Sequence, residues 1–221
     1  MQKWIFDIRS RPFFLLIAAF LILSILVYTD ITETFDNDVI NYVYTLAGNP
    51  SLDLTIQTIT EFGNVFYMAP FSFILLIIKR TRRIGLVLII SIVALAILTG
   101  YIKCGVNQLR PDLEFAGIPF PIDVEPDTFS LFCSAYAVSY PSGHVARAAA
   151  FAFVLGYVLS SRFPRGCYLL WIYPLVISIS RIYILQHFPT DVIGGTLLGV
   201  LVAGIASKQL KLNLVFEKLK T

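Results

Sequence analysis

The chain has 221 residues, of which 57% are hydrophobic and 14% charged, with a formal net charge of +3 and a mean hydropathy of +0.78. This composition is too apolar for an ordinary soluble domain, and the length suits one domain. We therefore expect a single all-α domain over residues 1–221, an integral membrane bundle. Its basic residues flank apolar runs, which excludes nucleic-acid binding in practice.

Six apolar runs predict six transmembrane helices. In chain order they cover residues 12–28, 65–78, 84–102, 145–160, 167–185 and 192–207, each near or slightly below the ~20 residues that a spanning helix needs. The first run follows Lys3, Arg9 and Arg11, as a signal peptide would. It is longer than a typical signal-peptide core and has no prompt cleavage site, so we expect a retained helix.

The segments on one side of these helices are expected to differ in structure. Residues 35–46 and 51–62 carry apolar residues at roughly helical spacing, separated by the turn Gly48-Asn49-Pro50. They predict interfacial or re-entrant helices in the first outer loop. Residues 111–140 hold four prolines and five acidic residues, which indicates an irregular outer loop.

The distribution of charge predicts the orientation. Of the 17 lysines and arginines, 13 lie in four regions that the positive-inside rule places in the cytoplasm, which requires an even number of spans. These are Lys3, Arg9, Arg11, Lys79, Arg80, Arg82, Arg83, Arg162, Arg165, Lys208, Lys211, Lys218 and Lys220. We expect a multi-pass plasma-membrane protein with both termini cytoplasmic.

The other four basic residues map to the outer side together with both histidines. They are Lys103, Arg110, Arg147 and Arg181, and the histidines are His144 and His187. Snorkelling helix ends would explain one or two of these cations but not the gathering of all of them. The outer face is therefore predicted to carry the active site.

The three cysteines fit no metal-binding spacing. Cys104 and Cys133 both fall on the predicted outer side and could form a disulfide. Three buried thiols, including Cys167, is the interpretation that we favour.

The stretch KCGVNQLRP places Lys103 and Arg110 seven residues apart. That spacing predicts one face of a helix two turns long, which Pro111 ends. Two cations on one stripe suit a multivalent anion, although such a spacing also arises often by chance.

The stretch YPSGH, residues 140–144, opens the fourth span. A turn through Pro141, Ser142 and Gly143 would point backbone N–H groups at a phosphate, at the positive end of a helix. The Ser142 hydroxyl could donate as well, and His144 would face the same pocket. The alternative is an ordinary serine cap with a polar residue at the helix end.

The stretch SRIYILQHFPTD, residues 180–191, places Arg181 near the outer end of the fifth span and His187 in the following turn. Pro189 is suited to start the sixth span, with Asp191 in its first turn. Asp191 could then accept a hydrogen bond from one imidazole nitrogen of His187, leaving the other as nucleophile or base. Alternatively, the pair stabilises only the helix start.

Taken together, the order and spacing of the three stretches resemble the tripartite signature of the type 2 phosphatidic acid phosphatase (PAP2) superfamily. The resemblance implies that His187 attacks phosphorus and forms a phosphohistidine, that Asp191 orients it, and that His144 protonates the leaving oxygen. It further implies a metal-independent hydrolase without cofactor. The implied phosphate-binding residues are Lys103, Arg110, Ser142, Gly143 and Arg181.

The expected partner is a lipid phosphate in the membrane, with no obligate protein partner. The small size resembles prokaryotic phosphatases of undecaprenyl or dolichyl diphosphate, which recycle glycan carriers. A phosphatidate or phosphatidylglycerophosphate phosphatase and a lipid phosphotransferase remain alternatives. The intact His–His–Asp set argues against a non-enzymatic transporter or scaffold.

Arg147 follows His144 by three residues and is expected on the same helix face. An unpaired arginine costs roughly 2.5–3.5 kcal/mol at the bilayer centre. A second substrate phosphate would give Arg147 a partner, which favours a diphosphate. The alternatives are a pair with an outer carboxylate, or snorkelling.

Overall fold

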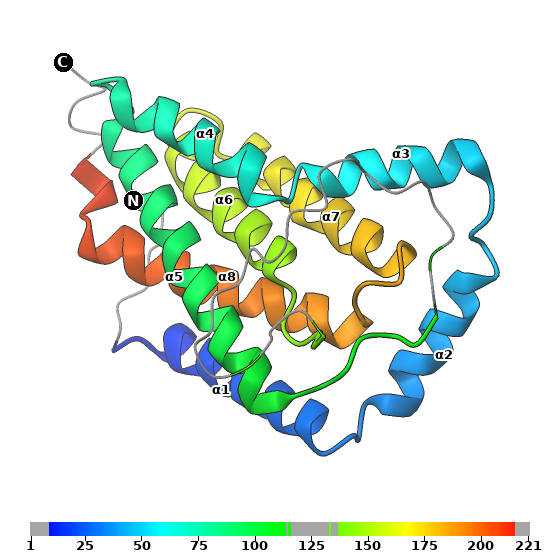
Figure 1. Ribbon diagram of the computed structural model, residues 1–221. Coiled ribbons are helices and arrows are strands. Elements are labelled where there is room, and N and C mark those ends of the chain that lie inside the picture. Colours follow the sequence, from blue (N-terminus) through cyan, green and yellow to red (C-terminus); the bar gives the residue numbers. More distant parts are fainter. Residues whose placement is uncertain (1–8, 114, 116–132, 134–136, 215–221) are drawn as a thin grey trace.

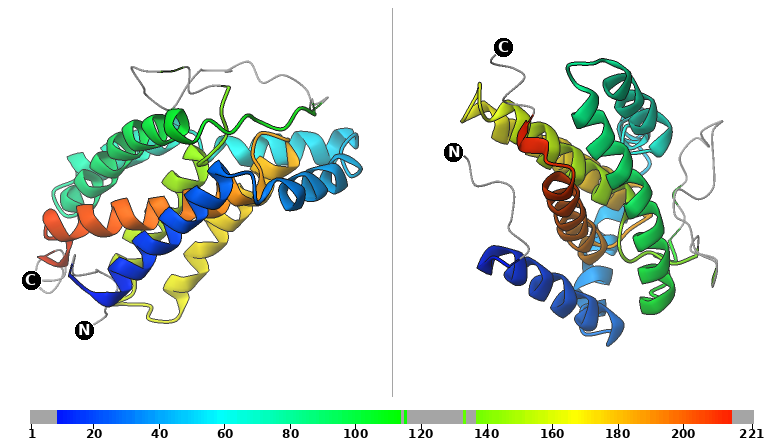
Figure 2. Two further views of the ribbon diagram at one scale, coloured as in Figure 1. Left: turned by 90° about the horizontal axis from the view of Figure 1, so that it is seen from below. Right: turned by 90° about the vertical axis from the view of Figure 1, so that its left-hand side faces the viewer.

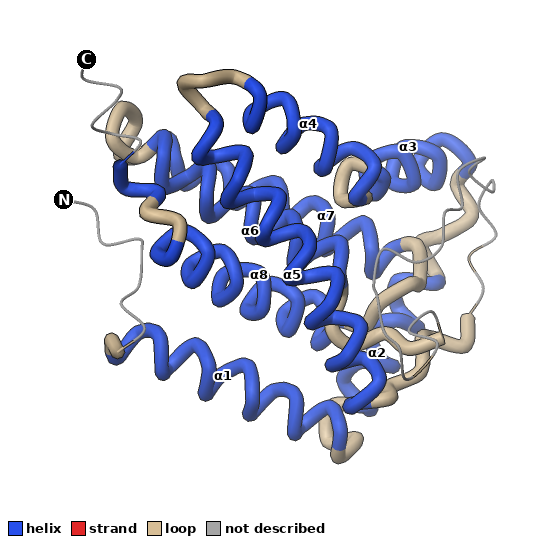
Figure 3. The backbone as a smooth tube through the Cα atoms, turned by 60° about the vertical axis from the view of Figure 1, so that its left-hand side comes forward, coloured by secondary structure: helices blue, strands red, loops and turns tan. Residues whose placement is uncertain are grey.

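The computed structural model describes residues 9–113, 115, 133 and 137–214, and Figure 1 shows their arrangement. All regular elements in this part of the chain are helical, as Figure 3 shows, and the all-α prediction is confirmed for it. The helices are α1 (Arg11–Tyr28), α2 (Glu33–Tyr44), α3 (Pro50–Glu61), α4 (Val65–Ile77), α5 (Arg82–Val106), α6 (Gly143–Leu159), η1 (Gly166–Trp171), α7 (Ile172–Tyr183), α8 (Pro189–Gln209) and η2 (Leu212–Leu214). Lys3, Lys218, Lys220 and most of the predicted irregular outer loop lie outside the described residues.

Each of the six predicted runs corresponds to a helix, but not every helix is long enough to be a span. Four segments are long and apolar enough to cross a membrane: α1, α5, α8 and the continuous stretch Gly166–Tyr183. Helices α3 and α4 form a fifth candidate span when they are taken together across a 41° bend. Alone, the 13 residues of α4 rise only about 20 Å, short of the ~30 Å of a bilayer core. Helix α6 has 17 residues, so six spans stays a prediction.

Helix α6 lies in the interior of the bundle, in contact with α5, α7 and α8 (Figures 1 and 2). Its residues 145–154 are all buried. The α6–α8 contact is close because α8 presents glycines there. A Cβ added to Gly199 would lie 2.1 Å from the carbonyl oxygen of Ala146, and one added to Gly195 would lie 2.5 Å from that of Ser142.

Helices α4 and α5 form an antiparallel hairpin with a similarly close contact. A Cβ on Gly85 would lie 2.3 Å from the backbone nitrogen of Leu76. The hydroxyl of Thr81, in the turn between the helices, donates to the carbonyl of Leu75 at 2.9 Å. The turn is therefore fixed by both packing and hydrogen bonding.

The two predicted helices of the first outer loop are present as α2 and α3, with the expected turn between them. Gly48 has φ +103, a conformation that favours glycine, and Asn49 caps α3 with Pro50 as its first residue. Helix α3 is held against α7, since the Tyr183 hydroxyl donates to Asp53 Oδ1 at 2.7 Å.

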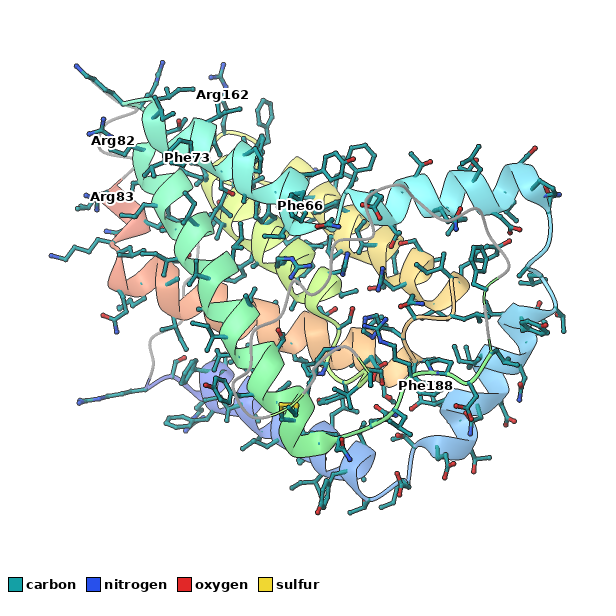
Figure 4. The ribbon with its side chains drawn as sticks, in the orientation of Figure 1. Phe66, Phe73, Arg82, Arg83, Arg162 and Phe188 are labelled. Carbon is teal, nitrogen blue, oxygen red and sulfur yellow. A yellow bond between two sulfur atoms is a disulfide. The ribbon has the colours of Figure 1, made fainter. Side chains whose placement is uncertain are left out.

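The molecule has two chemically different ends. Figure 4 shows Arg82, Arg83 and Arg162 at one end and Phe188, beside the start of α8, towards the other. Helices α5 and α8 connect the two ends. Lys103, near the end of α5, and Asp191, at the start of α8, therefore belong to the same end of the bundle.

Candidate active site

The three motif stretches meet beside the start of α8. The backbone N–H of Ser142 donates to the carbonyl of Asp191 at 3.1 Å, which joins the second stretch to the third. Lys103 Nζ donates to the carbonyl of Val138 at 2.5 Å, and Arg110 donates to the side chain of Gln186. Segments from α5, the α6 start and the α7–α8 turn are thus connected directly.

His187 and Asp191 form the expected pair. Imidazole Nδ1 lies 3.3 Å from Asp191 Oδ2, and His187 is only 2% exposed. The same Oδ2 accepts the backbone N–H of Phe188 at 2.7 Å, where Pro189 begins α8. One carboxylate therefore both stabilises the helix start and holds the imidazole, so the two interpretations of this pair are compatible.

Burial lowers the pKa of His187 well below its ordinary value of 6.5, and the positive charges of Arg181, Lys103, Arg110 and His144 lower it further. An imidazole in this environment stays neutral at neutral pH. If Asp191 holds Nδ1–H, the lone pair is on Nε2.

The prediction that Lys103 and Arg110 share a helical face is wrong. Helix α5 ends at Val106, because Asn107 adopts a left-handed conformation with φ 57. Asparagine tolerates that conformation and ends helices there. The chain then returns in an extended segment that pairs Leu109 with Val138, and this segment brings Arg110 to the site.

The turn before α6 offers fewer backbone donors than predicted. Pro141 has no N–H, and the N–H of Ser142 is bonded to Asp191, which leaves Gly143 in the first turn of α6. The hydroxyl of Ser142 is buried and has no hydrogen-bond partner among the described residues, and it makes no capping bond. These observations favour a hydroxyl available to a ligand over an ordinary serine cap.

Arg147 is buried, with 1% exposure, which contradicts snorkelling. Its Nη2 and Nε donate to the carbonyl of Gly63 at 3.2 and 3.4 Å. Gly63 lies at the α3–α4 bend, where an added Cβ would be 3.2 Å from Cδ2 of His144. Arg147 thus holds this bend against His144, and the second-phosphate contact stays a prediction.

Asp36 is a residue of the site that the sequence did not single out. It is 1% exposed, and the backbone N–H and hydroxyl of Thr190 donate to its two carboxylate oxygens at 3.1 and 2.5 Å. Burial raises the pKa of Asp36, while hydrogen bonds from Thr190 and Thr32 act in the opposite direction. Helix α2 is therefore attached to the residue that precedes Asp191.

Cys104 and Cys133 form a disulfide, visible as the yellow bond in Figure 4, with Cα atoms 5.8 Å apart. The expectation of three buried thiols is therefore wrong, although Cys167 is a buried free cysteine. The left-handed turn at Asn107 is followed by the pairing of Leu109 with Val138, which lies five residues after Cys133. The disulfide fixes the residue next to Lys103.

Comparisons with known proteins cover this part of the chain. Residues 84–214 match the model of the PAP2 superfamily, a range that includes all three motif stretches. The chain is 35% identical over 142 residues to the undecaprenyl-diphosphatase of Sulfolobus acidocaldarius, a match that covers 64% of this chain and 62% of that protein's length. It is 28% identical over 192 residues to phosphatidylglycerophosphatase B of Bacillus subtilis, covering 82% and 86% respectively.

Two solved structures share the fold. The crystal structure of a transmembrane PAP2-type phosphatidylglycerolphosphate phosphatase from Bacillus subtilis superposes with a TM-score of 0.73 at 24% identity, covering 90% of this chain and 96% of that one. The crystal structure of Aquifex aeolicus LpxE gives a TM-score of 0.55 at 25% identity, with coverages of 79% and 95%. The arrangement of helices is therefore shared with a solved transmembrane protein.

Proposed function

Because this chain is an integral, multi-pass membrane protein that belongs to the PAP2 superfamily, we propose that it is a lipid phosphatase that hydrolyses the terminal phosphate of a polyprenyl diphosphate. The observation that carries the proposal is the buried imidazole of His187, held at Nδ1 by Asp191, with a pKa that the charges of Arg181, Lys103 and Arg110 help to lower. A neutral nucleophile in a cationic environment suits attack on a phosphoryl group.

In the proposed reaction, Nε2 of His187 attacks the terminal phosphorus. A nitrogen–phosphorus bond forms as the bond from phosphorus to the bridging oxygen breaks, and His144 gives its proton to that oxygen. His144 then takes a proton from water, which attacks the phosphohistidine and releases inorganic phosphate. Asp191 stabilises the positive charge that develops on the imidazole ring.

The phosphoryl oxygens would be held by a set that replaces the charge of a metal ion: Lys103, Arg110, Ser142, Gly143 and Arg181. Three fixed cations and two neutral donors stabilise charge that increases on the equatorial oxygens in the transition state. The unbonded hydroxyl of Ser142 supports this assignment. The reaction is therefore proposed to need no metal.

The choice of a polyprenyl diphosphate is supported by the 35% identity to the archaeal undecaprenyl-diphosphatase. Attack on a lipid diphosphate also releases a lipid monophosphate, which is a better leaving group than the alkoxide released from a phosphate monoester. The second candidate is a phosphatidylglycerophosphate phosphatase. It is favoured by the match to the Bacillus subtilis enzyme, which covers more of both chains.

The substrate is tested by phosphate release in detergent from polyprenyl diphosphates, phosphatidate and phosphatidylglycerophosphate, each with excess chelator. We expect release of the terminal phosphate from all three substrates at some rate, with the highest kcat/KM on a polyprenyl diphosphate. Highest kcat/KM on phosphatidylglycerophosphate would favour the second candidate. Loss of all turnover in chelator, restored by magnesium, would overturn the proposed cationic site.

The roles of the histidines are tested separately. His187→Ala is expected to abolish turnover and to form no phosphoenzyme. His144→Ala should lose most steady-state activity but retain a burst of lipid product with a diphosphate, because that leaving group depends less on an acid. Full steady-state activity of His144→Ala, or acid-labile phosphate mapped to residue 144, would show that the roles are assigned wrongly.

A further inference from the structure

A pocket lies at the end of the molecule opposite the candidate active site. It has a volume of about 390 Å3 and is lined by four cations and three leucines: Lys79, Arg80, Arg82, Arg83, Leu86, Leu210 and Leu214. Figure 4 shows Arg82 and Arg83 at this end. The proposed phosphatase reaction uses none of these residues.

The walls of this basic pocket are built from two fixed turns. One is the α4–α5 turn, closed by the bond from Thr81 to Leu75 and by the close contact at Gly85. The other follows α8, where Lys211 has φ 51 and the chain enters η2 with Leu212 fully buried. The backbone on both sides of the pocket is therefore fixed, and Lys79, Arg80 and Arg82 extend from it as exposed side chains.

Arg83 connects the two walls. Its Nη1 donates to the carbonyl oxygens of Lys211 and Leu210, at 2.8 and 3.3 Å. These acceptors follow the last turn of α8, where carbonyl groups lack partners within the helix. The guanidinium thus joins the first turn of α5 to the end of α8, and the other cations are arranged around that joint.

The charge of the pocket is one-sided. Among the residues that the structure describes, no acidic residue lines it, and no ion pair engages Lys79, Arg80 or Arg82. The pocket also includes the first residues of α5, where helix N–H groups favour an anion. The leucines add an apolar wall next to these cations. Such a site suits a phosphate group attached to a hydrocarbon chain.

We propose that this pocket binds the phosphate headgroup of an anionic phospholipid at the membrane surface opposite the active site. Basic pockets between membrane helices recognise such headgroups. Bound there, the lipid would bridge the α4–α5 turn and the end of α8 and would stabilise their contact. This inference does not rest on the proposed phosphatase activity.

The test uses the full chain in neutral detergent and measures thermal unfolding against the concentration of added lipid. The lipid probe is phosphatidylglycerol, a phosphodiester without a terminal phosphate to hydrolyse, and phosphatidylcholine and inorganic phosphate are the comparison probes. We expect phosphatidylglycerol to raise Tm in a saturable way. A similar rise with phosphatidylcholine would contradict charge recognition, and one with inorganic phosphate would contradict a lipid ligand.

Two matched double variants place the effect. Arg80→Gln with Arg82→Gln removes two charges from the pocket, whereas Arg162→Gln with Arg165→Gln removes two from the same end of the molecule outside it. Each cation contributes to the binding of an anionic headgroup. We therefore expect the first pair to raise the phosphatidylglycerol concentration that gives half of the rise in Tm by about tenfold or more, on the order of what two charges contribute. The second pair should change it by less than about threefold.

Equal weakening of lipid binding by both pairs would mean that diffuse surface charge, and not the pocket, binds the lipid, and it would overturn the proposal. An unchanged midpoint concentration in the first pair would also overturn it. If Arg82→Gln prevents folding, Lys79→Gln with Arg80→Gln alters only the turn before α5 and serves the same comparison. Phosphatase turnover of the lipid substrate, measured without added phosphatidylglycerol, should be unchanged in every folded variant, because these residues are far from the active site.

Discussion

Asp36 and Asp191 are buried carboxylates on either side of Thr190, and they hold different parts of the same helix start. Asp191 accepts from Phe188 and lies beside His187, whereas Asp36 accepts both donors of Thr190. The position of the imidazole therefore depends on a residue that does not touch it. We infer that Asp36 is a positioning residue for the pair.

Asp36→Asn should lower kcat by on the order of tenfold to a hundredfold with little change in KM. An amide has a single acceptor oxygen, so one Thr190 donor loses its partner, and small misplacements of reacting groups have effects of that size. Steady-state kinetics with saturating substrate measure the change. Asp38→Asn, exposed on the same helix, is the control and should behave as wild type.

A double-mutant cycle separates positioning from general loss of structure. Thr190→Val removes the hydroxyl donor, so its effect on kcat should not add to that of Asp36→Asn. Additive losses, or a rise in KM with kcat unchanged, would contradict the positioning role.

The pH profile of kcat/KM should have an acid limb below pH 6.5. This parameter reports ionisations of the free enzyme, and burial followed by four neighbouring positive charges lowers the pKa of His187 well below 6.5. Protonation removes the attacking lone pair, so activity falls as pH drops through this lowered pKa.

Arg110→Gln removes one of those charges and should move the limb to higher pH, whatever its effect on the absolute rate. Arg162→Gln, at the other end of the molecule, should leave the limb where it is. A wild-type limb at or above 6.5, or no shift in Arg110→Gln, would contradict this account of the nucleophile.

At the scale of the elements, the close contact of α6 with α8 fixes the site, because these helices carry His144 and Asp191. Two glycines of α8 face this contact: an added Cβ would lie 2.1 Å from Ala146 O at Gly199 and 2.5 Å from Ser142 O at Gly195. A third, Gly194, faces Tyr140 before the start of α6, and a Cβ there would lie 2.5 Å from the Tyr140 ring. Tyr140 in turn shares a hydrogen bond of 2.9 Å with Ser24 of α1. The helix-to-helix distance is therefore set by the absence of side chains.

Gly199→Ala should destabilise the protein by about 1–3 kcal/mol, the usual cost of overpacking a filled interior. Thermal unfolding in detergent measures it. Gly105→Ala is the matched control, since a Cβ on Gly105 has nothing within 4 Å. That change should be neutral or slightly stabilising, because alanine favours the helix. Equal effects of the two changes would show that the α6–α8 contact can spread without loss.

Local sequence predicted the apolar helices well, because hydrophobicity and length determine them directly. Local sequence also predicted the His187–Asp191 bond, because both residues belong to one turn and the helix start that follows it. Asn107 shows where this reasoning stops. Nothing local to KCGVNQLRP distinguishes a helix that continues from one that ends at a left-handed asparagine. The isolated bridge between Leu109 and Val138 joins residues far apart in the chain, so local sequence does not predict it.

Local sequence also could not identify Asp36 as a residue of the site. It and Asp38 are two acids in one amphipathic segment, and only the contact of α2 with α8 buries one and exposes the other. The three motif stretches were recognisable from spacing, but their mutual bonds are tertiary, such as that from Ser142 to Asp191.

For the whole molecule, the proposed orientation places the basic end in the cytoplasm and the active site outside. The disulfide between Cys104 and Cys133 supports this orientation, because disulfides persist mainly in oxidising compartments. The basic pocket would then face the inner leaflet, and the two phosphate-binding regions would serve opposite surfaces of the same bilayer.

Labelling of single introduced cysteines tests the orientation. Asp38→Cys and Arg82→Cys both place an exposed thiol, one at each end, and the native Cys167 is buried. A membrane-impermeant maleimide on intact cells should label Asp38→Cys and should reach Arg82→Cys only after permeabilisation. The reverse pattern would put the active site in the cytoplasm.

The disulfide also makes the stretch between residues 104 and 133 a covalent ring, 29 residues in sequence separation. Any one peptide bond cut inside that ring leaves a two-chain molecule whose halves stay linked, one with Lys103 and the other with both histidines. On a non-reducing gel such a nicked protein migrates as a single species, and reductant releases two fragments. Protease treatment alone therefore cannot divide the phosphate-binding residues between separate molecules by a cut in this ring.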